Sequence, residues 1–420
     1  MANQRIPLTR HTLGELLDVT RGMSLPGSNY ATSGELIRLT LGNFDYSGNG
    51  FKENTSKENI YYSGKVPDEY IMKAGDIITP LTEQTPGLLG TTARIPVSGK
   101  YIQSQDVALI TCKPGKLDPL FCYYLVSSTI VKQQLAAGSQ QTKIRHTSPD
   151  KIKACVVYIP DDIKIQNRIG ELLANIDEKI TWNCKAISEM EKLAKQIYDY
   201  WFVQFDFPDK NGHPYKSSGG RMIWNSTLKR DIPVGWSTDI LGNMINEAGT
   251  SISVSDKGEL PYTPMDKLPI RSMSFSSYLP TEEAQSSLVK YSKYDILIGA
   301  MRVYFHRVCI APFDGITRTT TFVLRPKRNL HYSYLYERLN ADDFIDYAVK
   351  MSNGSQQPMV SWSSLVNMPV LVPDDNVMTR FNSLFLNIRD QVISMNLENK
   401  VLSNTRDYLA PLLTNGQVEL

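Results

Sequence analysis

The chain has 420 residues, 41% of them hydrophobic and 21% charged, which is enough apolar side chain for more than one hydrophobic core. A formal net charge of +2 neither requires nor excludes nucleic acid, so the distribution of charge carries more information than the total. The five cysteines have no CxxC spacing, the N-terminus lacks the apolar run of a signal peptide, and no apolar run approaches the roughly 20 residues that cross a bilayer. We therefore expect a cytoplasmic protein without a membrane segment or a disulfide framework.

The first half of the chain consists of predicted short strands and turns, followed by one long helix. Its candidate elements are, in order, LGELLDVTRGMS (13–24), AGDIITPLT (74–82), DVALITCKP (106–114), the aromatic helical stretch FCYYLVSS (121–128), GSQQ (138–141) and ACVVYIPDD (154–162). Residues 164–201 contain no proline and place apolar side chains at three-to-four spacing, which predicts a long amphipathic helix. Asp161 and Asp162 precede that helix and suit its N-terminus, where acidic side chains cap free N–H groups.

A second copy of these elements follows about 213 residues later, in the same order. Its blocks are LGNMINEAGTSI (241–252), KYDILIGAM (293–301), TTTFVLRPK (319–327), YSYLYERL (332–339), GSQQ (354–357), MPVLVPDD (368–375) and a second amphipathic helix over about 377–410. The repeat predicts two similar globular modules of the α/β (α+β) class with pseudo-twofold symmetry. The two helices would bury their apolar stripes best against each other, as a long antiparallel coiled coil that separates the modules.

Basic side chains cluster in each copy, which supports a nucleic-acid-binding face. One cluster lies within 132–153 and the other within 302–328, where aromatic residues are interleaved. Arg, Gln and Asn side chains pair with base edges, whereas Lys and Arg neutralise phosphates. The candidate DNA-binding residues are Gln140, Gln141, Lys143, Arg145, His146, Arg302, Tyr304, His306, Arg307, Arg318, Gln356 and Gln357. Two alternatives stay open: GSQQ is a structural loop common to both copies, and the clusters are ordinary solvated surface.

Signatures of catalysis are missing from the sequence. There is no Asn/Asp-Pro-Pro-aromatic loop of a DNA methyltransferase, no glycine-rich cofactor loop, and no GxxxxGK[ST] phosphate loop. The five histidines have no metal-ligand spacing. We therefore expect no catalytic residue, no bound metal and no cofactor in this chain.

Together these features resemble the specificity subunit of type I restriction–modification systems. The resemblance rests on the two modules, each trailed by a long helix, on GSQQ and Pro-Asp-Asp, on YDYWFVQFDFP (198–208) and on the restart at IPVGW (232–236). It implies two target-recognition domains that bind a split sequence in double-stranded DNA, two modification (methyltransferase) subunits as partners, and restriction motor-nuclease subunits for cleavage. The expected division is 1–160 for the first recognition domain, 161–206 for the first spacer helix and its aromatic tail, 207–231 for a linker, 232–373 for the second domain and 374–420 for the second spacer helix.

The long helices also suit a DNA-binding protein on physical grounds. A helix over 164–201 would be about 57 Å long, and modules that read one face of a duplex must lie about 34–36 Å apart or somewhat more. The flanks of the helix pair would receive partner subunits, with Trp182, Trp201 and Phe202 as candidates, although these aromatics would equally serve as core. Two other interpretations remain: a DNA-modifying or cleaving enzyme with unrecognised motifs, and a helical scaffold that binds proteins.

Overall fold

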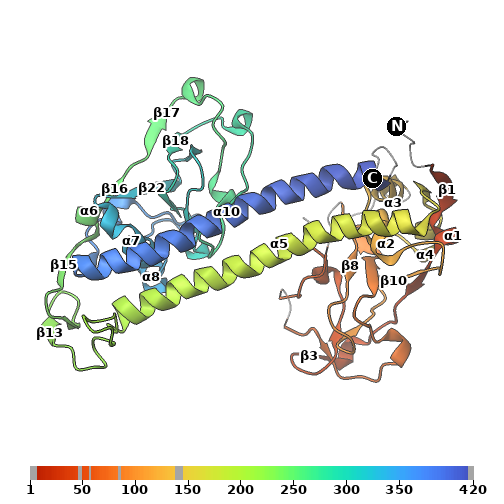
Figure 1. The fold of residues 1–420 in the computed structure, drawn as a ribbon, viewed down its shortest axis with the longest axis horizontal. Coiled ribbons are helices and arrows are strands. Elements are labelled where there is room, and N and C mark those ends of the chain that lie inside the picture. Colours follow the sequence, from red (N-terminus) through yellow and green to blue (C-terminus); the bar gives the residue numbers. More distant parts are fainter. Residues whose placement is uncertain (1–6, 46–49, 56–57, 84–86, 138–144, 415–420) are drawn as a thin grey trace. The chain divides into compact units, whose positions relative to one another are not determined.

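The computed structural model describes residues 7–45, 50–55, 58–83, 87–137 and 145–414, and they form two compact units. Unit 1 comprises Met1–Lys179 and Leu402–Leu420, and unit 2 comprises Ile180–Val401. Each unit therefore contains one globular module and a portion of each of two long helices (Figure 1).

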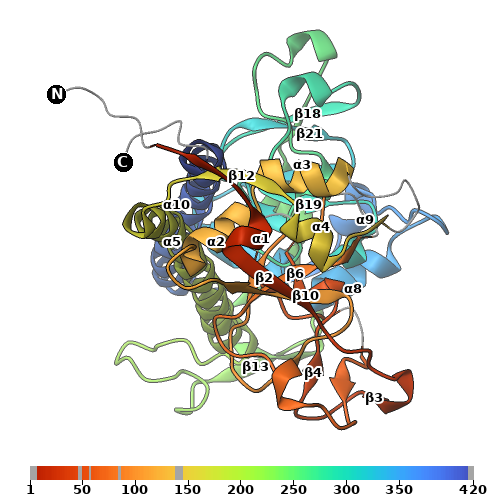
Figure 2. The ribbon, with the colours of Figure 1, turned by 90° about the vertical axis from the view of Figure 1, so that its right-hand side faces the viewer.

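The module of unit 1 is built on a four-stranded antiparallel sheet of strand order β2-β10-β6-β8. Its strands and helices are β1 (Thr9–Thr12), α1 (Leu13–Leu16), β2 (Leu17–Arg21), β3 (Tyr30–Ala31), β4 (Ile37–Arg38), β5 (Tyr61–Tyr62), β6 (Ile77–Pro80), β7 (Thr82–Glu83), β8 (Ala93–Arg94), β9 (Tyr101–Ile102), β10 (Val107–Cys112), α2 (Pro119–Val126), α3 (Thr129–Ala137), β11 (Arg145–His146), α4 (Pro149–Lys153) and β12 (Val156–Ile159). A second small sheet, β3-β5-β4-β9, lies beyond the first (Figure 2). Helices α1, α2 and α4 lie close to β2 and β10 in the same view, so the main core of unit 1 forms between these helices and the sheet.

The module of unit 2 repeats this arrangement, with a four-stranded sheet of order β16-β22-β19-β20. Its elements are β13 (Met222–Asn225), β14 (Arg230–Pro233), β15 (Ser237–Ile240), α6 (Leu241–Met244), β16 (Ile245–Glu247), β17 (Thr250–Ile252), β18 (Leu288–Tyr291), β19 (Ile296–Gly299), β20 (Val308–Ile310), β21 (Gly315–Arg318), β22 (Thr321–Pro326), α7 (Tyr332–Leu339), α8 (Asp342–Lys350), α9 (Trp362–Leu365) and β23 (Pro369–Val372). In each unit the strand that precedes the Leu-Gly turn pairs with the last strand of the module, β1 with β12 and β15 with β23. The expected duplicated fold of mixed helices and strands is confirmed.

The duplication extends to individual hydrogen bonds around the Leu-Gly turn that opens each module. The N–H of Leu13 donates to Cys155 at 2.8 Å, and the N–H of Leu241 donates to Met368 at 2.9 Å. In both units a lysine ammonium caps the turn, because Lys113 donates to the carbonyl of Gly14 and Lys327 to that of Gly242. Lys327 belongs to the basic cluster over 302–328, and the structure uses it internally.

Two long helices follow the modules, α5 (Ile163–Tyr198) and α10 (Asp375–Thr414). A single π-helical turn, Asp199–Val203, extends α5. The predicted capping by Pro-Asp-Asp holds in both copies, since Asp162 accepts the N–H of Lys164 at 2.8 Å and Asp374 accepts that of Asn376 at 2.9 Å.

In unit 1, the start of α5 packs beside the end of α10. Ile169 and Leu173 of α5 and Leu413 of α10 are buried in one core cluster. Asp177 joins three elements, because it accepts the phenol O–H of Tyr124 at 2.7 Å and the guanidinium of Arg406 at 2.7 Å. The helix ends are therefore joined to each other by an ion pair and to α2 by apolar packing and a hydrogen bond.

In unit 2, the same two helices pack in antiparallel orientation. The amide of Asn183 donates to Glu398 at 2.7 Å and to Asn399 at 2.8 Å, while the ring of Tyr198 lies 6.3 Å from that of Phe381. As the residue number rises along α5, the number of its neighbour on α10 falls. The antiparallel pairing predicted from the apolar stripes is confirmed.

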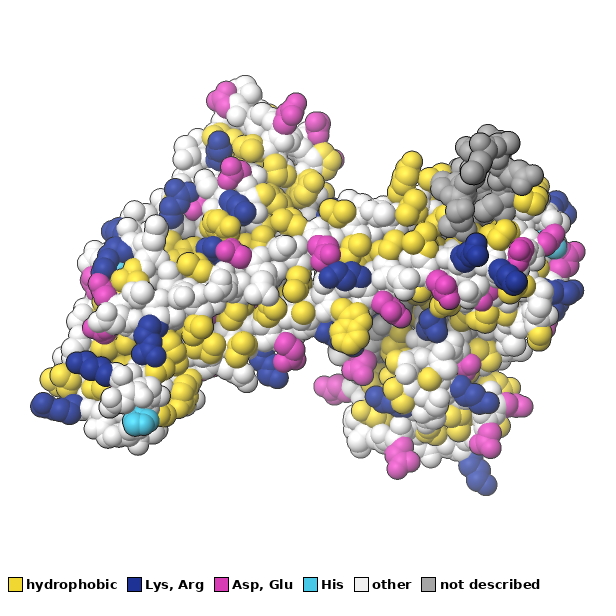
Figure 3. Space-filling view, viewed as in Figure 1, with side chains coloured by type: hydrophobic (Ala, Val, Ile, Leu, Met, Phe, Trp, Pro, Cys, Tyr) yellow, Lys and Arg dark blue, Asp and Glu magenta, His cyan; other side chains and the backbone are white. Residues whose placement is uncertain are grey.

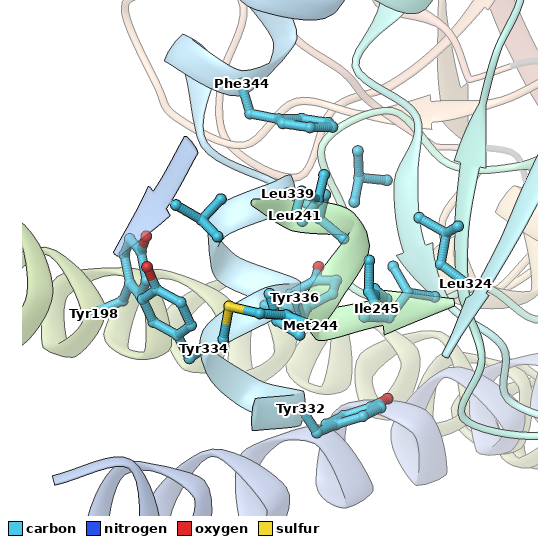
Figure 4. Close-up of a cluster of buried hydrophobic side chains, with 14 of the residues drawn as sticks. Tyr198, Leu241, Met244, Ile245, Leu324, Tyr332, Tyr334, Tyr336, Leu339 and Phe344 are labelled. Carbon is cyan, nitrogen blue, oxygen red and sulfur yellow. The ribbon is translucent and has the colours of Figure 1, made fainter. Parts of the chain in front are cut away.

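The main core of unit 2 is rich in tyrosine. Tyr332, Tyr334 and Tyr336 of α7 are buried, and Tyr334 points at Tyr198 of α5 (Figure 4). Among the described residues no helix is long and apolar enough to cross a membrane, and all five cysteines are free thiols.

Candidate nucleic-acid interface

Two loops lie side by side at one edge of the unit 2 sheet. The first follows β19 and spans residues 300–307, and the second is a tight turn that carries GSQQ (354–357). Asn353 and Met359 exchange backbone hydrogen bonds of 3.0 and 2.9 Å, which close the second loop beneath its tip. We call these segments the paired loops of unit 2.

Backbone hydrogen bonds hold the paired loops together. Arg302 donates its N–H to Pro358 at 2.7 Å, and Val360 donates to Ala300 at 3.0 Å. The guanidinium of Arg302 also reaches the carbonyl of Gln356 at 3.5 Å. The side chains of Gln356 and Gln357 are exposed at the tip. Three of the predicted residues, one cationic and two with amides, are thus brought to one surface.

A short 3₁₀ turn, Val303–Phe305, projects two aromatic rings from the first loop. The residues on either side, Arg302 (φ 51°) and His306 (φ 55°), both have left-handed backbone conformations. Tyr304 is 51% exposed, Phe305 is 39% exposed, and their ring centres lie 4.9 Å apart. We call residues 302–306 the aromatic turn.

His306 supports the aromatic turn from inside and is only 2% exposed. Its Nε2 lies 2.9 Å from both the carbonyl and the amide oxygen of Asn340, and its Nδ1 lies 3.5 Å from a carboxylate oxygen of Asp342. Because both ring nitrogens face protein groups, we assign His306 a positioning role in place of the DNA contact expected from the sequence.

The basic cluster over 302–328 divides into exposed and internally used side chains. Arg325 forms a 2.7 Å ion pair with the buried Asp295, and that hydrogen bond raises the pKa of the guanidinium. Arg328 pairs with Asp375 at 2.6 Å. Arg318 is exposed at the end of β21, and Arg307 donates to the carbonyls of Asp266 and Leu268 beside the aromatic turn. On the face shown in Figure 3, basic and acidic side chains are mixed.

Unit 1 builds the equivalent loops with different chemistry. Strand β7 pairs with β11, which places Glu83 opposite Arg145 and Thr82 opposite His146. Glu83 is buried, lies 3.5 Å from Arg145, and accepts N–H groups from residues 87–89 at 2.9–3.1 Å. The backbone hydrogen bond beside this pair also has a counterpart in unit 2. Thr147 donates its N–H to the carbonyl of Leu81, as Val360 donates to that of Ala300.

Glu83 is a member of this site that was not predicted from the sequence. The signal was present, because Glu83 and Arg302 each follow directly after a matched strand block, yet they carry opposite charge. Of the other residues predicted for unit 1, His146 is exposed, and Gln140, Gln141 and Lys143 lie outside the described residues.

The three aromatic residues expected to bind partners differ in their environment. Trp182 on α5 is 66% exposed, with the ammonium of Lys185 5.3 Å from its ring. Trp201 and Phe202 are buried in the unit 2 core beside Phe381. Trp182 is therefore the member of this group that is free for a partner. In the described part of the chain, no group of three or more His, Cys, Asp or Glu side chains is placed to hold a metal.

Comparison with known proteins agrees with this architecture. Residues 9–192 match the family described as Type I restriction modification DNA specificity domain. The chain is 22% identical over 314 residues to the type I restriction enzyme MjaIX specificity subunit of Methanocaldococcus jannaschii, a match that covers 71% of this chain and 69% of that protein. The crystal structure of the S subunit of a type I restriction–modification system from M. genitalium has a similar fold, with a TM-score of 0.63, 16% identity, and coverage of 98% of this chain and 97% of that one.

Proposed function

We propose that this chain is a specificity subunit of a type I restriction–modification system, which recognises a split target in double-stranded DNA and assembles the modification and restriction subunits there. The observation that carries the proposal is the duplicated module, built twice on the same sheet order and continued each time by a long helix. A duplication within one chain allows two unrelated half-sites to be read, whereas a homodimer reads a palindrome.

Sequence readout is assigned to the paired loops. Unit 2 contributes Arg302, Gln356 and Gln357, whose donors and acceptors suit guanine and adenine edges in the major groove. In unit 1, Arg145 and His146 occupy the corresponding edge, next to Glu83. Opposite charges at matched positions support the idea that the two modules read different sequences. Arg307 and Arg318 are proposed phosphate contacts, which fix position without reading sequence.

The chain itself is assigned no reaction. In this proposal, methylation of adenine and DNA cleavage belong to two modification subunits and to the restriction subunits, and the exposed flank of α5 around Trp182 is a docking site for a modification subunit. The proposed domain limits remain 1–160, 161–206, 207–231, 232–373 and 374–420, and the proposed location is the cytoplasm, where chromosomal DNA is available.

The test is to express the chain with its modification subunit and map methylated bases by single-molecule sequencing. We expect a two-part motif with a fixed gap. Arg302→Ala and Gln356→Ala should each relax specificity in one half of the motif, by about 1–3 kcal/mol at the affected base. Lys192→Ala, an exposed cation on α5 ten residues beyond Trp182, is the matched control and should leave the motif unchanged. A continuous motif without a gap would contradict the proposal.

A further inference from the structure

We propose that the aromatic turn of unit 2 is a wedge that inserts between stacked base pairs, so that this module reads its half-site partly through the ease with which one base step opens. The inference rests on the proposed function, because it assumes that unit 2 faces DNA. It adds shape readout to a site otherwise described by base-edge hydrogen bonds.

The base of the aromatic turn is rigid. Left-handed conformations are unfavourable for residues other than glycine, and they persist only where surrounding contacts impose them. Here Arg302 is held through its N–H to Pro358, and the carbonyl of His306 accepts the N–H of Arg271 at 3.0 Å. Val303, between the two, is buried. The rings of Tyr304 and Phe305 are therefore presented on a fixed support, and little ordering would be required on binding.

The tip of the aromatic turn combines apolar rings with nearby cations. Proteins that kink a duplex insert apolar side chains between base steps, and Lys or Arg side chains nearby neutralise phosphates. The turn offers two adjacent aromatic rings, with the guanidinium of Arg302 at its start and that of Arg307 5.9 Å from the ring of Phe305. The nearby carboxylate of Asp342 is already paired with Arg271 at 2.8 Å, so less of its negative charge opposes an approaching phosphate.

The aromatic residues of this turn occur in the second copy of the repeat and not in the first. The segment equivalent to the aromatic turn in the first copy, Thr82–Gly90, has the sequence TEQTPGLLG and contains no aromatic residue. Its carboxylate, Glu83, binds backbone N–H groups of its own loop. A wedge in unit 2 therefore predicts that distortion of the DNA is confined to one half of the split target.

The experiment uses the full chain assembled with its modification subunits, on duplexes that carry the mapped target. 2-Aminopurine, whose fluorescence rises when it is unstacked, replaces one base at a time across both halves, and the adenines that become methylated are left out of the scan. We expect a several-fold rise at a single step, in the half whose specificity Arg302→Ala relaxes. Tyr304→Ala should remove the rise and weaken binding by about 10-fold to 100-fold, whereas Tyr304→Phe should retain both.

Tyr278→Ala is the matched control, because Tyr278 is an exposed tyrosine of unit 2 that packs against Phe313 outside the aromatic turn. It should leave the fluorescence unchanged, and thermal melting should show that the Tyr304 variants remain folded. A fluorescence rise that persists in the Tyr304→Ala, Phe305→Ala double variant would overturn the wedge. The wedge would also be overturned if Tyr304→Ala relaxed the specificity at one base of the target but left the fluorescence unaltered, because the rings would then read a base edge. Failure of the proposed function would be visible before this experiment, because the wild-type complex would then show no split target in the methylation map.

Discussion

Glu337 provides a pH-dependent test of the packing between α7 and α5 in unit 2. Glu337 is 4% exposed and lines a cavity of about 260 Å³ together with Glu191, Lys195 and His306. Burial raises its pKa from 4.5 to about 8, and Asp199 and Glu191 act in the same direction, whereas Lys195 opposes them. The carboxyl is therefore protonated in the folded protein at neutral pH.

The sign of the effect follows from this raised pKa. Below about pH 4.5 the group is protonated in both the folded and the unfolded chain, and its full contribution to stability is present. As the pH rises toward 8, the unfolded chain releases the proton while the folded chain retains it, so unfolding becomes more favourable. At 1.36 kcal/mol for each pKa unit, the wild type should lose at most about 4 kcal/mol between pH 5 and pH 8 relative to Glu337→Gln.

Urea denaturation of the full chain, followed by tryptophan fluorescence, measures this difference. All five tryptophans lie within 180–401, so the signal reports on unit 2 alone. Glu337→Gln should be more stable than the wild type at pH 8 and similar to it at pH 5. Glu189→Gln, which removes an exposed carboxylate from α5, is the control and should follow the wild type. Parallel pH profiles for Glu337→Gln and the wild type would refute the assignment of a protonated, buried Glu337.

Three further outcomes are expected. Four residues are inserted after Ala186 and four after Met395, because the pairing of Asn183 with Glu398 places these two positions near each other. The insertions should lengthen both helices by about 6 Å and the unread gap in the DNA target by one or two base pairs. An unchanged gap in the mapped methylation motif would contradict a spacer role. Trp182→Ala should weaken assembly with the modification subunit in size-exclusion chromatography without lowering the melting temperature, and equal assembly would exclude this face. Asp177→Asn removes the charge partner of Arg406 and should lower the free energy of unfolding of unit 1 by roughly 1–3 kcal/mol. Urea titrations followed by circular dichroism measure this difference. An unchanged free energy of unfolding would mean that the ion pair does not stabilise unit 1.

The architecture of this protein was predictable because it rests on local and repeated patterns. Three-to-four apolar spacing without proline is sufficient to predict α5, and α10 as far as residue 410, although α10 continues through Pro411 to Thr414. Asp162 and Asp374 cap these helices as acidic residues before a helix do. The internal repeat indicated two similar modules before any strand was placed. Even GSQQ, common to both copies, pointed to the loop that forms one side of the candidate interface.

The assignment of each polar or aromatic side chain to surface or interior was decided by tertiary structure, because it depends on partners distant in the chain. His306 and Arg302 are four residues apart, yet His306 is buried against Asn340 and Arg302 faces the GSQQ loop. Trp182 and Trp201 both belong to the amphipathic segment predicted over 164–201. Trp182 is exposed, whereas Trp201 is buried beside Phe381 of α10. The sequence by itself determined which segments are helices and strands and that they occur twice; only long-range packing determined which charges remain available to bind DNA.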